Sequence, residues 1–132
     1  MYPTRSPELS AAKRLSLLKR RAEFLRVAGA RQKWAAPGLI LQACPTPIDD
    51  GRVVRKGPFR VGFTVSRRVG NAVERNRVRR RLREVAKRII PAHAVDGIDF
   101  VIIGRSATLK RPFDALIGDL RIALRKLNAY HD

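Results

Sequence analysis

One stretch, residues 67–88, constrains the fold of this chain most, because it combines dense positive charge with a helical pattern of apolar residues. It reads RRVGNAVERNRVRRRLREVAKR, in which ten residues are Lys or Arg and two are Glu. Four apolar residues recur at spacings of four, three and four, which places them on one side of an α-helix: Val78, Leu82, Val85 and Ile89. The same spacing places a polar set on the opposite side: Asn76, Arg80, Arg83 and Lys87. The stretch therefore predicts an amphipathic helix that packs its apolar side on the protein and turns its cationic side outward.

Both ends of this helix carry sequence signals. Asn71 can cap the N-terminus, and Glu74 follows three residues later, which is the spacing of a capping box. Pro91 has no backbone N–H and disfavours the helical conformation of the residue before it. We therefore expect the helix to end at Pro91.

The charge on this helix indicates a polyanion as partner. Like charges four residues apart destabilise a helix by roughly 0.2–0.5 kcal/mol per pair. A solvated basic face explains one or two such charges, whereas this density favours a bound polyanion, above all nucleic acid. The planar fork of arginine also matches phosphate oxygens in a way that lysine does not.

The composition supports the same partner and bounds the location. The 132 residues suffice for one domain, and 29 basic against 11 acidic residues give a net charge of +18. Such a charge implies salt-dependent attraction to phosphate backbones. An acidic membrane surface is the rival polyanion, but no apolar run is long enough to span a bilayer and the N-terminus shows no signal-peptide core. Cys44 is the only cysteine, so we expect no disulfide framework. Together with the missing membrane and export signals, this predicts a cytoplasmic location without membrane association.

The rest of the chain divides into shorter segments whose patterns predict an α+β domain. We expect a flexible arm over 1–14, a helix over 15–28, a basic connector over 31–37, strands over 38–44, 58–68 and 98–104, an optional short strand near Val69, loops over 45–56 and 91–97, and a final helix from Pro112 to about Leu127. The domain then spans residues 15–128, with a tail over 129–132. The order α-β-β-(β)-α-β-α predicts two layers, with about three helices against a small mixed sheet.

One strand face and two aromatic residues are candidates for contact with nucleic acid. Residues 58–68 alternate, so that one side carries small polar residues: Gly62, Thr64 and Ser66, beside Arg60. Such a face lets an extended chain lie close to the backbone, and a solvent-exposed sheet face explains the alternation equally well. Phe24 and Trp34 could each stack on a base, although packing is the more common role of a single aromatic residue.

The residues that usually carry catalysis are not arranged for it. His93 and His131 lie far apart and outside any metal-ligand spacing, and the nucleophile-elbow, Walker and dinucleotide-binding motifs are missing. Asp96 and Asp99 come nearest to a carboxylate pair, whereas a protein nuclease needs several convergent carboxylates to hold Mg²⁺. The residues alone therefore indicate a small basic protein that binds RNA or DNA, with no catalytic or metal-binding side chains.

Residues 60–83, RVGFTVSRRVGNAVERNRVRRRLR, resemble the signature region of the bacterial ribonuclease P protein subunit, with Arg75-Asn76-Arg77 at its centre. A Leu-Lys-x-x-x-x-Phe pattern that ends at Phe24, the apolar strands and the final helix agree with it, so the resemblance covers roughly residues 15–127. It implies a fold like the second domain of ribosomal protein S5, with a strand–helix–strand crossover of the uncommon left hand.

The resemblance also implies a function. The family's protein binds a large catalytic RNA, and together they remove the 5′ leader of precursor tRNA by endonucleolytic cleavage, which forms the mature 5′ end. The RNA with its bound Mg²⁺ performs the hydrolysis. The resemblance thus implies a tRNA-processing, RNA-binding subunit of an endoribonuclease ribonucleoprotein, with Mg²⁺ held mainly by the RNA, and we expect a monomer.

By position, the resemblance assigns two groups of site residues. The RNA-binding helix carries Arg75, Asn76, Arg77, Arg79, Arg80, Arg83 and Lys87. Arg75 lies nearest the buried side, which indicates a partly structural role. The leader-binding cleft carries Phe24, Thr64, Ser66, Arg67 and Arg68. Ala28 and Gln42 stand where other members have aromatic residues, which shifts the expected leader contact from stacking toward charge and shape.

Two other interpretations stay open at this point. A ribosomal-protein-like RNA binder or chaperone shares the basic helix but has no leader cleft. A stand-alone nuclease needs a metal site, for which Asp96 and Asp99 are the candidates. The ribonuclease P interpretation predicts that one groove beside the Arg75-Asn76-Arg77 helix is lined by Phe24, Thr64, Ser66 and Arg67. A structure in which these faces point apart would count heavily against it.

Overall fold

The computed structural model describes residues 15–49, 52–53 and 59–132. The arm expected over residues 1–14 lies outside the described residues, as do 50–51 and 54–58 of the expected loop and following strand. The strands are β1 (Leu15–Leu17), β2 (Gln32–Ala35), β3 (Leu39–Pro45), β4 (Ile48–Asp49), β5 (Arg52–Val53), β6 (Phe59–Thr64) and β7 (Ile98–Gly104). The α-helices are α2 (Arg21–Gly29), α3 (Ala72–His93) and α4 (Phe113–Lys126), and the short 3₁₀ helices are η1 (Arg67–Val69) and η2 (Ser106–Leu109).

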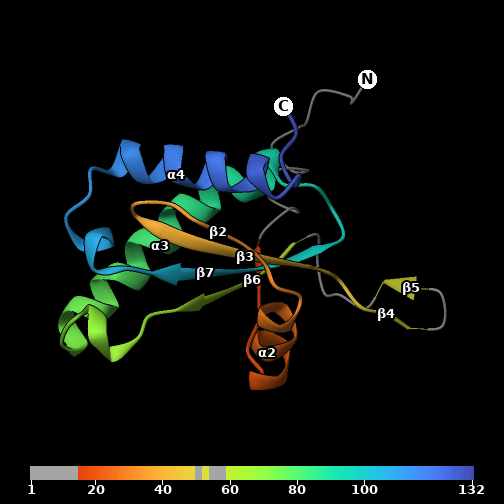
Figure 1. Cartoon of the computed structure of the whole chain (residues 1–132), viewed down its shortest axis with the longest axis horizontal. Helices are drawn as coiled ribbons and strands as arrows, with labels where there is room; N and C mark the ends of the chain where they lie inside the picture. Colours follow the sequence, from red (N-terminus) through yellow and green to blue (C-terminus); the bar gives the residue numbers. More distant parts are fainter. Residues whose placement is uncertain (1–14, 50–51, 54–58) are drawn as a thin grey trace.

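Five strands form one mixed sheet in the order β1-β6-β7-β3-β2. The central strand β7 pairs in parallel with β6 on one side and antiparallel with β3 on the other. At the edges, β1 runs parallel to β6 and β2 runs antiparallel to β3. The hairpin of β4 and β5 stands apart from this sheet (Figure 1).

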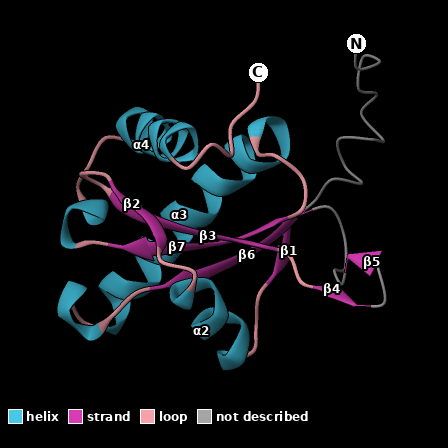
Figure 2. Cartoon of the chain, turned by 45° about the vertical axis from the view of Figure 1, so that its right-hand side comes forward, coloured by secondary structure: helices cyan, strands magenta, loops and turns pink. Residues whose placement is uncertain are grey.

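Helices lie on both faces of the sheet (Figures 1 and 2). Phe100 and Ile102 of β7 point to the face covered by α3 and α4, and Val101 between them points to the face partly covered by α2. The predicted α+β fold, with three helices in the described part and a mixed sheet, is confirmed, and α2 adds a partial third layer to the two that were expected. The handedness of the β6–α3–β7 crossover stays a prediction.

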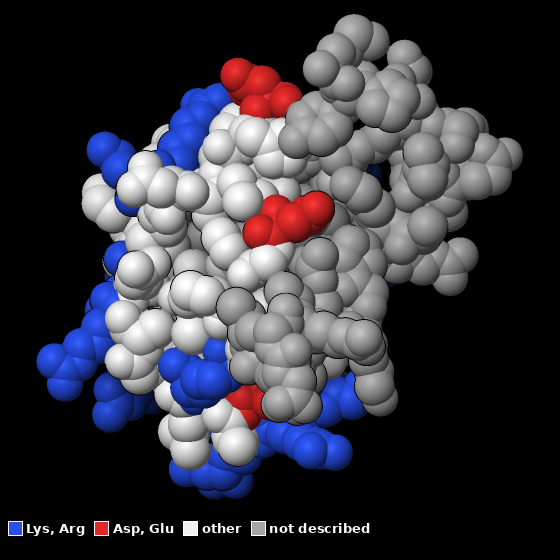
Figure 3. Space-filling view, turned by 90° about the vertical axis from the view of Figure 1, so that its right-hand side faces the viewer, with Lys and Arg blue, Asp and Glu red and all other residues white. Residues whose placement is uncertain are grey.

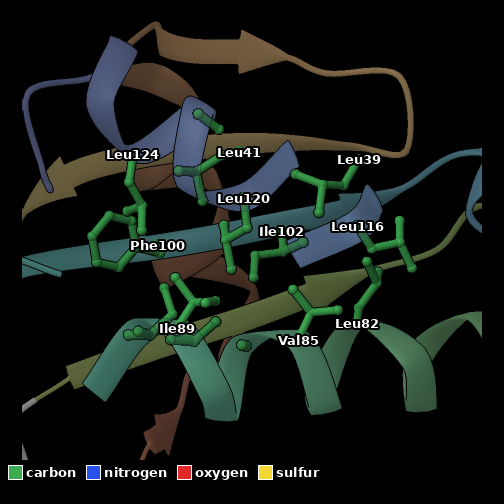
Figure 4. Packing of buried hydrophobic residues seen from close by; sticks show 14 of the residues in the cluster. Leu39, Leu41, Leu82, Val85, Ile89, Phe100, Ile102, Leu116, Leu120 and Leu124 are labelled. Carbon is green, nitrogen blue, oxygen red and sulfur yellow. The ribbon is translucent and has the colours of Figure 1, made fainter. Parts of the chain in front are cut away.

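The main core fills the space between the sheet, α3 and α4 (Figure 4). The sheet contributes Leu39, Leu41, Phe100 and Ile102; α3 contributes Leu82, Val85 and Ile89; α4 contributes Leu116, Leu120 and Leu124. Gly104 at the end of β7 lets α3 approach closely, because a Cβ there would lie 2.6 Å from Cγ1 of Val78. The predicted apolar side of α3 is therefore the side that docks on the sheet.

Two short strands replace segments for which the sequence predicted other structure. Leu15–Leu17, expected to begin the first helix, forms β1 beside residues 59–61, and the helix begins only at Arg21. Residues 32–35 of the expected connector form β2. Segments of three or four residues are too short to show a period, so pairing with the sheet decides their conformation.

The expected end of the basic helix is wrong, and so is the optional strand near Val69. Pro91 lies inside the last turn of α3, which ends at His93. Ile89, Ile90 and Ala94 are buried around this proline, and their packing offsets the hydrogen bond that proline cannot donate. Val69 belongs to η1, and it packs partly buried against the core.

The residues after α4 close one end of the core. Ala129 is fully buried, and its carbonyl accepts a hydrogen bond from the backbone N–H of Val95 (2.9 Å). The Tyr130 ring stacks on the imidazole of His93, with 4.8 Å between ring centroids. The segment 129–132, expected to be a tail, thus packs against the C-terminal end of α3 over most of its length.

Replacing Leu82 by alanine should lower the free energy of unfolding by about 2–5 kcal/mol, because the fully buried side chain leaves a cavity between α3 and the sheet. Urea denaturation followed by circular dichroism measures the change. Val73→Ala on the same helix is the matched control, since Val73 is 68% exposed and its loss should change stability by less than about 0.5 kcal/mol. Equal effects of the two substitutions would contradict the assigned buried side.

Candidate RNA interface

The capping box predicted for α3 is confirmed and fixes where the cationic helix begins. The Asn71 side chain accepts a hydrogen bond from the backbone N–H of Glu74 (2.8 Å), and the Glu74 carboxylate accepts one from the backbone N–H of Asn71 (3.0 Å). The acidic side chain also complements the positive end of the helix dipole. The cap therefore sets the residue at which the basic helix starts, and the buried stripe sets the direction in which its basic side chains point.

We call the exposed side of this helix the α3 outer face; it consists of Asn76, Arg77, Arg80, Arg83 and Lys87. Within the described residues, the side chains of Arg77 and Arg80 make no hydrogen bond or ion pair. The guanidinium of Arg83 lies 6.0 Å from the Phe63 ring centroid, and Nζ of Lys87 lies 3.7 Å from a Glu84 carboxylate oxygen. The face thus offers guanidinium groups that can pair with phosphates at little cost to the fold.

Two predicted helix residues are half-buried on the flank of this face. Nη1 of Arg75 donates a hydrogen bond to the carbonyl of Gly70 (2.8 Å), in agreement with a partly structural role. Nη1 of Arg79 donates to the side-chain oxygen of Asn76 (3.1 Å). Their charges still add to the local field, but both guanidinium groups are oriented by the protein.

The other flank of α3 is tied to α4. The guanidinium of Arg81 donates a hydrogen bond to the backbone carbonyl of Arg111. The guanidinium of Arg88 lies 4.8 Å from the Phe113 ring centroid at the start of α4. These contacts hold the two helices side by side on one face of the sheet.

The other predicted group lies largely on the opposite sheet face, which we call the α2 face. Phe24 is partly buried there, and a Cβ on Gly62 would come within 2.5 Å of its ring carbon Cε1. The aromatic ring therefore rests directly on the backbone of β6. Thr64 follows Gly62 on the same side of the strand and is exposed, so the structure brings Phe24 and Thr64 to one face.

Ser66, Arg67 and Arg68 lie between the α2 face and α3. All three are exposed, and η1, which contains the two arginines, contacts α3. The two groups of predicted residues are thus connected by residues 66–70 of the chain.

Gln42 also lies on the α2 face, in a row of paired residues that crosses four strands. Gly62 pairs with Val101, Val101 with Gln42, and Gln42 with Lys33. Gln42 is half-buried, Lys33 is exposed, and Ala28 of α2 is exposed as well. The row offers one aromatic ring over Gly62, an amide and an ammonium group to a ligand.

A buried ion cluster that sequence reasoning missed attaches α2 to the sheet. Asp99 of β7 is fully buried, and its carboxylate pairs with the Arg26 guanidinium of α2 and accepts a hydrogen bond from the Thr46 hydroxyl (3.0 Å). Nε of Arg60 lies 3.6 Å from the same carboxylate, and its guanidinium pairs with Glu23 of α2. The signal available in the sequence was a single acidic residue inside the apolar strand IDFVIIG.

This cluster also removes the candidate metal site of a stand-alone nuclease. The Asp99 carboxylate is enclosed by its two arginines and a threonine, while Asp96 is exposed. In the described part of the chain, no group of three His, Cys, Asp or Glu side chains is placed to hold a metal ion. The chain's own residues therefore do not fit a Mg²⁺ site there.

Positive charge is widespread on the surface. Figure 3 shows Lys and Arg along the left margin and at the lower end of the molecule, where α2 lies, with few acidic groups.

Over the described residues, no helix is long and apolar enough to span a membrane.

Comparisons with known proteins identify the family. A model of the family Ribonuclease P matches residues 12–128. The chain belongs to the ribonuclease P protein family. Over 118 residues it is 56% identical to the ribonuclease P protein component of Paramagnetospirillum magneticum, covering 89% of this chain and 86% of that protein. It is 50% identical over 115 residues to that of Gluconacetobacter diazotrophicus, covering 87% and 93%.

Solved structures of ribonuclease P proteins share the fold. The protein from Staphylococcus aureus superposes with a TM-score of 0.67 at 23% identity, covering 87% of this chain and 97% of that one. The protein from Thermotoga maritima superposes with a TM-score of 0.63 at 22% identity, covering 80% and 91%. The function expected from the sequence, that of a ribonuclease P protein component, is confirmed at the level of the family, and the ribosomal-protein-like alternative gains no support.

Asp99→Ala should destabilise the protein by about 3–5 kcal/mol, because it leaves the guanidinium groups of Arg26 and Arg60 without their buried counter-ion. Denaturant unfolding measures the loss. Asp96→Ala, three residues earlier and exposed, should change stability by less than about 0.5 kcal/mol. An Asp99→Ala variant as stable as the Asp96→Ala control would show that the cluster does not anchor α2.

Proposed function

We propose that the chain binds the catalytic RNA of ribonuclease P through the α3 outer face and the 5′ leader of precursor tRNA on the α2 face, and thereby promotes cleavage of the leader. The observation that carries the proposal is the construction of α3. Its apolar stripe is buried, whereas Arg77 and Arg80 point away from the protein with no acidic partner among the described residues. Such a surface suits the phosphates of a folded RNA.

The α2 face supports the leader as second ligand. A single strand is held without strict sequence reading when bases stack on an aromatic ring and cations flank the path. Phe24 supplies the ring, the missing side chain of Gly62 lets the ring come close to the strand, and Lys33, Arg67 and Arg68 supply exposed cations nearby in the chain or sheet. The leader would then lead toward α3 along residues 66–70.

The chemistry, in this proposal, belongs to the RNA partner. Mg²⁺ bound by the RNA supplies the charge stabilisation and the activated water that hydrolysis of a phosphodiester needs. The chain itself binds and orients the two RNAs: α3 holds the catalytic RNA, and the α2 face holds the leader beside it. The buried pairing of Asp99 supports this division, since the best-placed carboxylate serves the fold.

Reconstitution tests the function directly. Purified protein mixed with a bacterial ribonuclease P RNA at low Mg²⁺ should strongly stimulate removal of the 5′ leader from precursor tRNA. The stimulation should disappear when the leader is trimmed to nothing. RNA binding without stimulation would instead favour a general RNA-binding role.

Arg80→Ala should weaken binding to the ribonuclease P RNA and reduce the slope of log K against log salt by about one, because one phosphate contact is lost. Titrations at several salt concentrations measure both quantities. Arg80→Lys is the matched control: it keeps the charge, so the slope should stay near that of the wild type while the bidentate geometry is lost. An unchanged slope in Arg80→Ala would place this residue outside the interface.

Gly62→Ala should weaken binding of leader-bearing precursor tRNA by about tenfold, because the new methyl group would displace the Phe24 ring from the strand. Affinity for mature tRNA, which has no leader, should not change. Gly118→Ala on α4 is the control, because a Cβ added at this position would have nothing within 4 Å. This substitution should leave tRNA binding intact and stabilise the helix by up to about 1 kcal/mol. A normal preference of Gly62→Ala for precursor over mature tRNA would exclude the α2 face as leader site.

A further inference from the structure

Trp34, the only tryptophan of the chain, lies on the edge strand β2 and is 37% exposed. It pairs in register with Leu41, whose side chain belongs to the main core, so the indole lies on the side of the sheet that α3 and α4 cover. The ammonium group of Lys126 at the end of α4 lies 5.2 Å from the centroid of the indole. The sequence left the role of this residue between packing and base stacking, and the structure places it partly exposed beside one lysine.

Lys126, which contacts Trp34, belongs to the basic exposed side of α4. The side of α4 opposite its buried stripe carries Arg121, Ile122, Arg125 and Lys126, all exposed. Of the acidic residues of α4, Asp119 is buried and paired with Arg111, and Asp114 lies in the first turn at the far end. We call Trp34 with these four residues the α4 surface. Lys126 lies over the indole, the Arg125 guanidinium lies 4.4 Å from the centroid of the Tyr130 ring, and no acidic residue of α4 belongs to this surface.

The position of this surface relative to α3 decides which RNA can reach it. α4 is held beside α3 by the contacts of Arg81 and Arg88, so the α4 surface and the α3 outer face belong to the same side of the sheet. The α2 face lies on the opposite side. A leader bound beside Phe24 is therefore separated from Trp34 by the sheet, whereas α3 and the α4 surface lie on the same side of it.

We propose that the α4 surface is a second contact site for the catalytic RNA, in which an unpaired base stacks on Trp34 and the flanking phosphates pair with Arg121, Arg125 and Lys126. This inference rests on the proposed function of the α3 outer face. Stacking on an aromatic ring among cations is the usual way to hold an unpaired nucleotide. Ile122, which is 47% exposed, adds an apolar side chain to the same side of α4.

Trp34 itself reports on the proposed contact, because it is the only source of tryptophan fluorescence. Titration of the protein with ribonuclease P RNA should quench this fluorescence to a saturating value at one RNA per protein. Heparin of equal charge should leave the emission nearly unchanged, because it has no base to stack. Equal quenching by heparin, or quenching that depends on protein concentration in the absence of RNA, would overturn the proposal in favour of charge alone or of self-association.

Binding measurements test the energetic contribution. Trp34→Ala should weaken affinity for the ribonuclease P RNA by about 5- to 100-fold, and Trp34→Phe should recover most of it because the ring can still stack. Leu25→Ala is the matched control, since Leu25 is also a large exposed apolar residue but lies on α2. Circular dichroism checks that each variant is folded, so that a loss of affinity is read only from folded protein.

The outcomes separate this inference from the function on which it rests. Suppose that Arg80→Ala binds the RNA more weakly while Trp34→Ala binds it like the wild type. This result would overturn the role proposed for the α4 surface and leave that of the α3 outer face in place. Wild-type binding by both variants would overturn the proposed function as well. Quenching that occurs only when precursor tRNA joins a preformed complex would assign the surface to the substrate and overturn the inference.

Discussion

The placement of α2 depends on the buried carboxylate of Asp99. A charge without solvent has to be paired, and Arg26 from the helix and Arg60 from β6 meet at this group from two sides. Glu23 then pairs with Arg60, so the helix is tied to the sheet through both its acidic and its basic residue. Phe24 lies between these anchors in sequence, which explains why its ring is pressed onto Gly62. A polar cluster in the interior thus determines the form of a surface, and the α2 face would lose its shape without it.

In α3, by contrast, the charges are crowded at the surface instead of being buried. Repulsion between neighbouring arginines disfavours the helix, and three features oppose it: the capping box at Asn71, the stripe of buried side chains, and the close approach to Gly104. The arginines on the flanks of α3 are held by a carbonyl or an aromatic ring of a neighbouring segment. The charges of the outer residues remain available to a ligand. Stability and binding are therefore divided between different sides of one helix.

The elements that could be predicted from sequence are those long enough to show a period. α3 and α4 each bury a stripe at helical spacing, β3 and β7 are the apolar runs expected as buried strands, and the predicted outer residues of α3 are exposed. What could not be predicted depends on distant partners. β1 and β2 become strands only because the sheet edges accept them, and Pro91 stays helical only because Ile89 and Ile90 are buried beside it. The anchoring of the α2 face could not be predicted either, because no local pattern links Asp99 to Arg26, which lies 73 residues earlier in the chain.

The order of strands has a consequence for how the chain assembles. β7 lies between β6 and β3, so before residues 98–104 are available the five-stranded sheet can form only its β2–β3 and β1–β6 pairings. During synthesis the cationic helix precedes the strand on which it docks, and its apolar stripe has no complete sheet to cover it until β7 is inserted. Closure of the domain is thus a late and non-local event.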